Sequence, residues 1–227
     1  MNTQTKPCIV VSNVGKKVRT PDGYIPILQD INLNVKFGEA LAITGESGSG
    51  KTTLLGLMAG LDHPDQGDIE LLGETLADKS EEQRARIRNG QVGFVFQSFH
   101  LVTGATALQN VMLPLELGGQ ENARERARSV LEEVGLGARL DTLVERLSGG
   151  EQQRVAVARA YAVKPKILFA DEPTGNLDTV TGGQIIDLLF RLRDQHGSTL
   201  VLVTHEQRLA ERGDRRIAMQ RGRIEAD

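Results

Sequence analysis

The sequence predicts an α/β fold with a mixed, largely parallel core sheet, an N-terminal antiparallel β-subdomain and an inserted α-helical subdomain. Short apolar stretches alternate with helical patterns, which is typical of a parallel sheet flanked by helices. The runs ALAIT, KILFAD and STLVLVTH are continuously apolar, as expected of strands buried on both faces. In contrast, ILQDINLNV alternates apolar and polar residues, as in a partly exposed sheet.

The elements follow in order. CIVVSNV, ILQDINLNV and DIELL form the partly exposed sheet, and ALAIT leads into a helix, KTTLLGLMAG, that Gly60 ends. A charged helical stretch then surrounds the strand-like QVGFVF, and a helix is expected over 151–163. The strands KILFAD and STLVLVTH flank a further helix, and a hairpin turns at Arg221-Gly222. We expect one domain over 1–227, with a core and β-subdomain in 1–87 and 161–227 and a mostly helical subdomain in 88–160.

Composition and charge limit the expected partners and cellular compartment of the chain. The chain has 227 residues, of which 39% are hydrophobic, and a formal charge of -3, which gives no electrostatic reason to expect a nucleic-acid partner. Its single cysteine, Cys8, cannot form an internal disulfide and fits a reducing compartment. The first residues lack the apolar core of a signal peptide, and no run approaches the roughly 18 apolar residues of a membrane span. We expect a cytoplasmic chain that reaches a membrane only through a partner.

GESGSGKT matches the phosphate-binding pattern G-x-x-x-x-G-K-[ST] and lies between a predicted strand and a predicted helix. Glycines turn backbone N–H groups inward, Lys51 reaches the β- and γ-phosphates, and the Thr52 hydroxyl coordinates Mg²⁺. The alternative is an ordinary glycine-rich turn at a helix start. The expected nucleotide contacts are Gly45, Glu46, Ser47, Gly48, Ser49, Gly50, Lys51, Thr52 and Thr53.

Polar residues follow three of the predicted strands. Asp171 is the expected metal ligand after ILFA, and Glu172, expected on the other side of an extended backbone, is the candidate general base. Gln97 is a candidate metal or water ligand and His205 a candidate γ-phosphate partner, because parallel strands end at one edge. The alternatives are a helix cap or loop carboxylate for the acids and satisfied surface groups for Gln97 and His205.

LSGGEQQ suggests a second phosphate cradle. Ser148, Gly149 and Gly150 open a helix, so that a hydroxyl and free N–H groups meet the positive end of its dipole. A nucleotide bound at GESGSGKT already has its phosphates enclosed from one side, so it does not need a second phosphate-binding element from the same chain. A head-to-tail pair of copies would use both, because a two-fold interface is self-complementary and creates two composite sites.

The order GESGSGKT, Gln97, LSGGEQQ, ILFADEP, NLD and His205 resembles the nucleotide-binding domain of ABC transporters from end to end. The resemblance implies a P-loop NTPase fold, ATP with Mg²⁺, ATP hydrolysis, a signature element that acts in trans, and Asp178 at the dimer interface. Glu151 departs from the usual glutamine at the fifth signature position.

GFVFQSFHLV and DEPTGNLD look most like the lipoprotein-releasing (LolD) and macrolide-exporter (MacB) branch, and GLDHPDQGDIELLG resembles its YbbA group. This implies an integral-membrane permease partner, of the YbbP type in that group, at the cytoplasmic face of the cell membrane. Export, lipid or lipoprotein extraction and force transmission are all compatible with the branch. The apolar stretch after Gln97, with Phe99 and Leu113, would receive the permease; local packing is the alternative.

The base-stacking position departs from the family pattern. Members usually stack adenine on an aromatic residue before the P-loop, and Val18 occupies that place. Tyr24 is the nearest aromatic candidate, with an ordinary loop tyrosine as the alternative.

Other functions remain open from the sequence. A soluble, non-transport ABC ATPase is the main alternative, although the chain has neither the second ATPase domain nor the long insertions of such proteins. A P-loop kinase or GTPase would leave LSGGE unexplained.

Overall fold

Residue contacts group the chain into two units, one formed by residues 1–89 with 199–227 and the other by 90–198. The structure is a computed structural model that describes residues 6–21 and 23–225. Residues 1–5, 22 and 226–227 lie outside the description, and the beginning of the stretch searched for a signal peptide is among them. Across the described ranges, no helix has the length and apolar character that crossing a bilayer requires.

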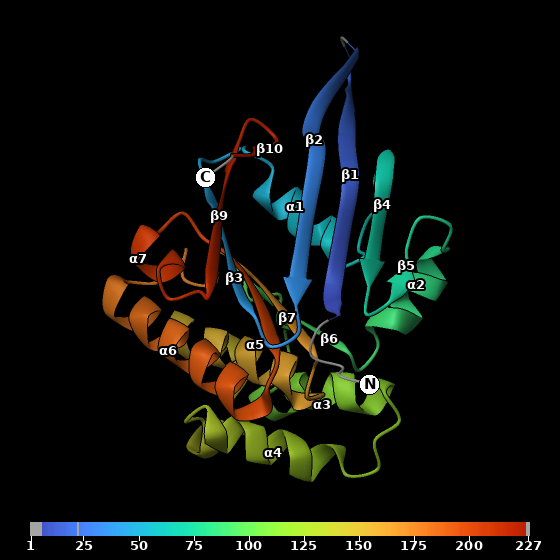
Figure 1. Cartoon of the computed structure of the whole chain (residues 1–227). Helices are drawn as coiled ribbons and strands as arrows, with labels where there is room; N and C mark the ends of the chain where they lie inside the picture. Colours follow the sequence, from blue (N-terminus) through green and yellow to red (C-terminus); the bar gives the residue numbers. More distant parts are fainter. Residues whose placement is uncertain (1–5, 22, 226–227) are drawn as a thin grey trace. The chain divides into compact units, whose positions relative to one another are not determined.

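The first unit contains an antiparallel sheet in the order β2-β1-β4-β5. Val11 of β1 lies opposite Leu33 of β2 and Ile69 of β4, so one apolar face runs across three strands. The two longest strands reach past the end of β4 as a projecting hairpin (Figure 1). The strands are β1 (Pro7–Thr20), β2 (Gly23–Lys36), β4 (Gln66–Leu71) and β5 (Glu74–Thr75).

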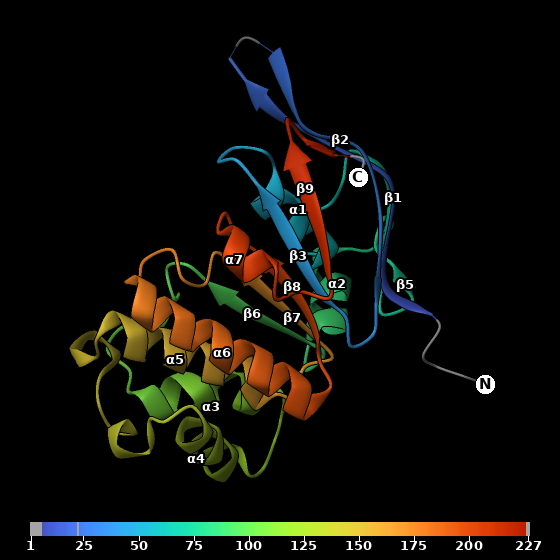
Figure 2. The ribbon, with the colours of Figure 1, turned by 60° about the vertical axis from the view of Figure 1, so that its left-hand side comes forward.

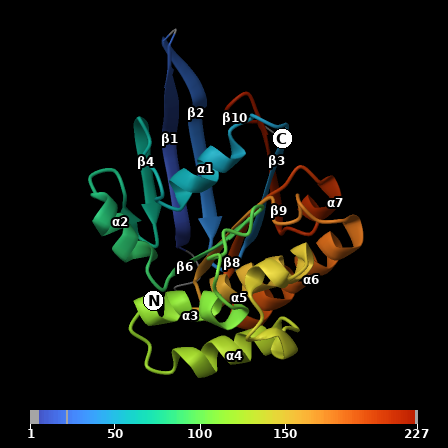
Figure 3. The ribbon, with the colours of Figure 1, turned by 180° about the vertical axis from the view of Figure 1, so that it is seen from behind.

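The same unit holds a second set of strands around β3 (Ala40–Gly45), which is paired in parallel with β8 (Thr199–Val203) and β9 (Arg215–Gln220). A short strand, β10 (Arg223–Ile224), closes a hairpin with β9. Helix α1 (Lys51–Met58) contacts β2 and β4 as well as β3 and β8, and Figure 3 shows it crossing the antiparallel strands. The remaining helices of this unit are α2 (Glu81–Arg88) and α7 (Gln207–Ala210).

The second unit combines two parallel strands with a group of helices, which Figure 2 shows together. Helix α5 packs against α3, α4, α6 and β6, so it is the centre of the unit. Tyr161 and Phe169 are fully buried there. The elements are β6 (Val92–Phe96), α3 (Ala107–Leu117), α4 (Ala123–Glu133), two 3₁₀ turns (Gly137–Arg139 and Val144–Arg146), α5 (Gly149–Ala162), β7 (Ile167–Asp171) and α6 (Thr179–His196).

Side-chain caps decide where the long helices begin. Ser148 caps α5 by accepting from the Glu151 N–H, so the helix starts at Gly149 and not at the expected residue 151. Asp178 caps α6, and Gly197 ends it with a φ of 65°. The predicted α/β class and antiparallel N-terminal sheet are confirmed. The predicted subdomain limits at 88 and 160 stay a prediction.

Candidate nucleotide-binding site

The loop between β3 and α1 has a backbone that only glycine accommodates. Gly45, Gly48 and Gly50 have φ values of 145°, 78° and 100°. A Cβ on Gly45 would lie 2.2 Å from the carbonyl oxygen of Met219, and one on Gly50 would lie 2.8 Å from Leu28 Cδ2. The loop is therefore pressed against β9 on one side and β2 on the other, which fixes the direction of its N–H groups.

Two polar side chains in this loop suit an anion. Lys51 is only 7% exposed, and its ammonium donates to the carbonyl oxygens of Gly45 (2.8 Å) and Glu46 (2.9 Å). Ser49 is 5% exposed, and its hydroxyl has no hydrogen-bond partner among the described residues. A buried cation in the first turn of α1 and a buried hydroxyl without a described partner fit a phosphate chain.

A turn from the far end of the chain supports the loop. The Gly222 N–H donates to the Ser49 carbonyl (3.1 Å), and the Gln29 N–H donates to the Gly222 carbonyl (2.8 Å). A Cβ on Gly222 would lie 2.3 Å from the Ile27 carbonyl oxygen. The sequence predicted this hairpin but not its contact with the phosphate loop, and the only available signal was the Arg-Gly pair at the turn.

His205 lies at the same sheet edge as the loop. Ile43 is opposite Val203 in the parallel pair of β3 and β8, and the Thr204 N–H donates to the Ile43 carbonyl (3.1 Å). Gly45, which ends β3, and His205, which follows β8, therefore lie at the carboxyl ends of neighbouring strands. The imidazole is exposed at this edge.

Tyr24 lies on the projecting hairpin. It is opposite Arg19 and 69% exposed, and Val18 on the other strand is 47% exposed. Leu28, which borders the phosphate loop, lies four residue steps along the extended strand from Tyr24, a length of about 13 Å. The nucleotide contact expected of Tyr24 stays a prediction.

In the second unit, Gln97 and Glu172 also follow neighbouring strands. Phe96 of β6 lies opposite Asp171 of β7 in parallel register, so the next residue of each strand begins a loop at the same edge. The backbone at Glu172 has a φ of 47°, which corrects the extended conformation expected from the sequence. A non-glycine residue in this region is strained, and such strain persists where neighbouring structure holds it.

The two loops are joined by a pair of amides. The Gln97 side chain donates to the Asn176 side-chain oxygen (3.3 Å), and the Asn176 side chain donates to the Gln97 carbonyl (3.0 Å). A Cβ on Gly175 would lie 2.7 Å from Gln97 Nε2, so the glycine makes room for this pair. Asn176 was not among the predicted site residues, although it lies in the NLD segment.

The predicted second phosphate-binding element, at the start of α5, contains a complete capping box. The Ser148 N–H and hydroxyl each donate to one Glu151 carboxylate oxygen at 2.9 Å, while Arg139 lies 3.3 Å from the other oxygen. The bonds from Ser148, more than the Arg139 charge, hold the pKa of the Glu151 carboxyl below its usual value. A Cβ on Gly150 would lie 2.5 Å from Thr181 Cγ2, so close packing against α6 requires glycine there.

Asp178 has a local structural role. Its carboxylate accepts from the N–H groups of Val180 and Thr181, each at 3.1 Å. The Thr181 hydroxyl and these N–H groups lower the pKa of the Asp178 carboxyl. Asp178 therefore caps α6, a role that the sequence analysis did not predict, and its expected place at a dimer interface stays a prediction.

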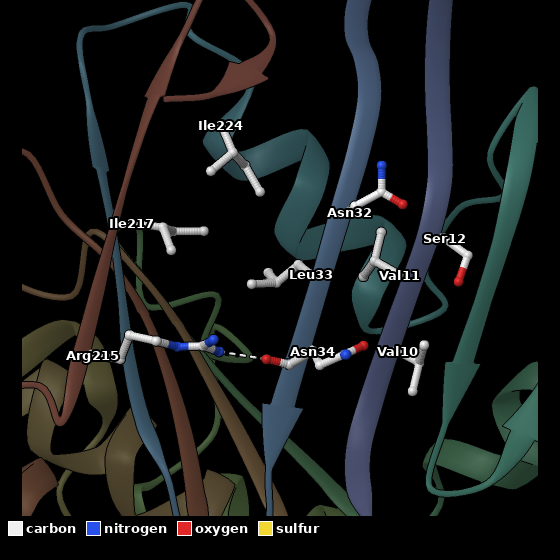
Figure 4. A pocket seen from close by; sticks show the side chains of 9 residues that line it. All are labelled: Val10, Val11, Ser12, Asn32, Leu33, Asn34, Arg215, Ile217 and Ile224. Atoms are coloured by element: carbon white, nitrogen blue, oxygen red, sulfur yellow. Dashed lines mark hydrogen bonds between the residues drawn. The ribbon is translucent and has the colours of Figure 1, made fainter. Parts of the chain in front are cut away.

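A separate hollow in the first unit does not suit a phosphate. It has a volume of about 510 Å³, and Leu33, Ile217 and Ile224 are among the residues that line it (Figure 4). Arg215 at its edge donates to the Asn34 carbonyl and is paired with Glu39 at 2.8 Å. Because these partners compensate the charge of Arg215, the phosphate loop is the better anion site.

Comparison with known proteins agrees with this geometry. The ABC transporter family model matches residues 28–175. The chain belongs to the ABC transporter family. It is an ATP-binding subunit of the LolD/MacB type and an ATPase, which excludes the kinase and GTPase alternatives.

The individual relatives support the same branch. The chain is 49% identical to YbbA of Escherichia coli K12, an uncharacterized ABC transporter ATP-binding protein, over 96% of this chain and 97% of that protein. It is 45% identical to the lipoprotein-releasing system ATP-binding protein LolD of Shewanella oneidensis, over 95% and 94% of the two chains. The dimeric bacterial ABC transporter cassette MJ0796 superposes with a TM-score of 0.89 at 40% identity, covering 96% of this chain and 97% of that one. The predicted resemblance to YbbA is confirmed.

Proposed function

We propose that this ABC ATPase forms an ATP-bound dimer that drives a separate integral-membrane permease. The observation that carries the proposal is the presence in one chain of two elements suited to an anion, the loop 45–53 and the capped helix start at Ser148–Gly150. A two-fold pair of chains uses both elements at each of two nucleotides. A related cassette, MJ0796, has been solved as a dimer and, in a post-hydrolysis state, with ADP and phosphate.

Each composite site takes its residues from both copies. Lys51 and the loop N–H groups bind the phosphates from one chain, and Ser148 with Gly149 and Gly150 covers the γ-phosphate from the other. Asp178 lies at the interface between the copies, and Tyr24 contacts adenine.

The oxygen donors of the site fit Mg²⁺. Thr52, Asp171 and Gln97 provide hydroxyl, carboxylate and amide oxygens, the hard ligands that this ion prefers. No group of three or more His, Cys, Asp or Glu side chains suited to a metal occurs among residues 6–21 and 23–225. In nucleotide sites Mg²⁺ is commonly held by one or two carboxylates and by the substrate phosphates. When bound, Mg²⁺ would neutralise charge on the β- and γ-phosphates.

Hydrolysis needs a base and a γ-phosphate contact. The Glu172 carboxylate accepts a proton from water as the water oxygen forms a bond to the γ-phosphorus. The bond from that phosphorus to the β–γ bridging oxygen breaks, and ADP and phosphate are released. His205 donates to the γ-phosphate, and Gln97 orients the water or the metal.

The apolar region after Gln97 supports a docking role. Val102 and Leu113 are 46% and 39% exposed, whereas Asn110 is buried and bonded to both the N–H and the carbonyl of Val102. A firmly held loop with apolar side chains facing outward suits a helix of a partner. We propose a YbbP-like permease at the cytoplasmic face of the membrane, working in export, lipoprotein extraction or force transmission.

Co-purification tests this function. The tagged chain is recovered from detergent-solubilised membranes of its host, and partners at near-equal stoichiometry are identified. We expect a multi-span membrane protein, and Leu113→Asp should reduce its recovery. The matched control is Leu61→Asp, which changes a similarly exposed leucine (42%) in the other unit. A soluble partner, with no chain in the membrane fraction, would instead indicate a non-transport ABC ATPase.

A further inference from the structure

One buried amide in α5 touches both loops that carry the candidate catalytic residues. Gln153 is fully buried, and its Nε2 donates to the Pro173 carbonyl at 2.6 Å and to the Phe96 carbonyl at 3.4 Å. Phe96 directly precedes Gln97, and Pro173 directly follows Glu172. A single side chain therefore bridges the backbone next to both residues.

The hydrogen bonds of this amide indicate that Gln153 is needed for its N–H donors and not for its oxygen. Among the described residues, Gln153 Oε1 has no hydrogen-bond partner although it is buried. The two carbonyls fix the orientation of the amide, because the reverse orientation would set oxygen against oxygen. An unpaired buried acceptor is destabilising, and methionine or leucine would fill the same volume without it. Purely structural packing does not explain an amide at this position.

The backbone that Gln153 holds is strained. Glu172 has a φ of 47° and precedes a proline, which restricts its conformation further. Strained residues persist where several contacts determine the backbone. The bond from Gln153 to the Pro173 carbonyl is one such contact, and it acts on the residue next to the candidate base.

The same helix holds the loop beyond Gln97. The half-buried guanidinium of Arg159 donates to the carbonyls of His100 (2.6 Å) and Phe99 (3.0 Å), two residues with φ values of 47° and 58°. Burial lowers the pKa of Arg159, and carbonyl oxygens compensate for the water it has lost. Helix α5 thus fixes the backbone on both sides of Gln97.

We infer that Gln153 is a positioning residue for ATP hydrolysis, which sets Gln97 and Glu172 relative to each other through the Phe96 and Pro173 carbonyls. The inference rests on the roles proposed above for these two residues. It concerns the catalytic step and not the phosphate loop, because every residue involved lies in the unit 90–198.

The test compares Gln153→Met with Ser198→Ala. Ser198 is 1% exposed and donates to the Pro165 carbonyl (2.7 Å), so its variant also removes a buried bond to a proline carbonyl, but one ahead of the amino end of β7. Steady-state hydrolysis and binding of a fluorescent ATP analogue are measured on the full chain and on the assembly that co-purifies with it. We expect kcat to fall by about tenfold or more in Gln153→Met, with nucleotide affinity within about twofold of the unchanged chain. Ser198→Ala should keep kcat within about twofold.

Two further variants separate positioning from loss of fold. Gln153→Asn keeps the amide but shortens its reach, so it should lose kcat as the methionine variant does. Single-turnover hydrolysis by Glu172→Gln should not fall further when Gln153→Met is added, because both changes act on one group. An additive loss, or a folded Gln153→Met with unchanged kcat, would overturn the inference. Normal turnover by Glu172→Gln would instead refute the proposed base, so the two failures are distinguishable.

Discussion

Gly222→Ala tests whether the turn between β9 and β10 supports the phosphate loop. The new Cβ would lie 2.3 Å from the Ile27 carbonyl oxygen, while ordinary contacts begin at 3.4 Å. The turn or β2 must therefore move by more than 1 Å. Such a movement would break the bond from the Gly222 N–H to the Ser49 carbonyl, which is now 3.1 Å long. The perturbation thus reaches the phosphate loop through a single hydrogen bond.

The magnitude follows from a comparison with Gly73→Ala. Gly73 has a φ of 85°, close to the 76° of Gly222, but a Cβ there would meet no atom within 4 Å. Both variants lose about 1–2 kcal/mol from the left-handed backbone. Only Gly222→Ala adds overpacking, about 1–3 kcal/mol, and a lost hydrogen bond, about 1 kcal/mol. We therefore expect its free energy of unfolding to be about 2–4 kcal/mol lower than that of Gly73→Ala.

Urea unfolding and nucleotide binding measure the two consequences. ATP affinity should fall by about tenfold or more in Gly222→Ala, equivalent to about 1.4 kcal/mol, and should be unchanged in Gly73→Ala. If the two variants are equally stable and bind ATP equally well, the turn does not support the loop and the reasoning is wrong.

Four other predictions concern the proposed site. Glu172→Gln should bind ATP but hydrolyse it about a hundredfold more slowly or worse, by single-turnover assay; near-normal turnover would contradict its role as base. Ser148→Arg and Lys51→Ala chains should each be inactive, and mixing them should restore one composite site per dimer; mixtures as inactive as the parents would contradict action in trans. With only Tyr24 to stack on the base, ATP should outcompete GTP by less than about a hundredfold, measured by competition binding. Because the pKa of Asp178 is lowered in the folded chain, its stabilisation should be present above the unfolded value of 3.8 and lost as pH falls through the folded value. The stability difference from Asp178→Asn in urea unfolding should therefore shrink below pH 3.8, and a constant difference would refute the assignment.

Much of the fold could be predicted because hydrophobic patterns are local. Continuous apolar runs gave the buried strands β3, β7 and β8, and alternation gave the antiparallel sheet. Helix α5 begins at Gly149, two residues before the predicted start, because the helical pattern in the sequence begins only at Glu151. The capping box of Ser148 instead brings both glycines into the first turn.

The site residues that could be predicted from the sequence are likewise those that lie in local motifs. The loop 45–53 and the two acids at the end of β7 each form a contiguous stretch of sequence, so a sequence motif is enough to identify them. Gly222 and Gln153 act through contacts with residues far away in the chain, and a lone glycine in a hairpin or a glutamine in a helix has no distinctive pattern. The left-handed backbone of Glu172 was equally invisible, because local preference favours an extended residue before proline.

Helix α5 gives a physical link between the helix start at Ser148 and the candidate base Glu172. Its first turn presents Ser148, and five residues later Gln153 holds the backbone beside Glu172. An α-helix transmits displacement along its axis with little deformation because each turn is hydrogen-bonded to the next. In the proposed dimer, Ser148 contacts the nucleotide bound by the partner, whereas Glu172 serves the nucleotide of its own chain. Binding of a γ-phosphate at one composite site would therefore bear on the position of the base at the other, so the two sites should be coupled through α5 without any change in the fold of either unit.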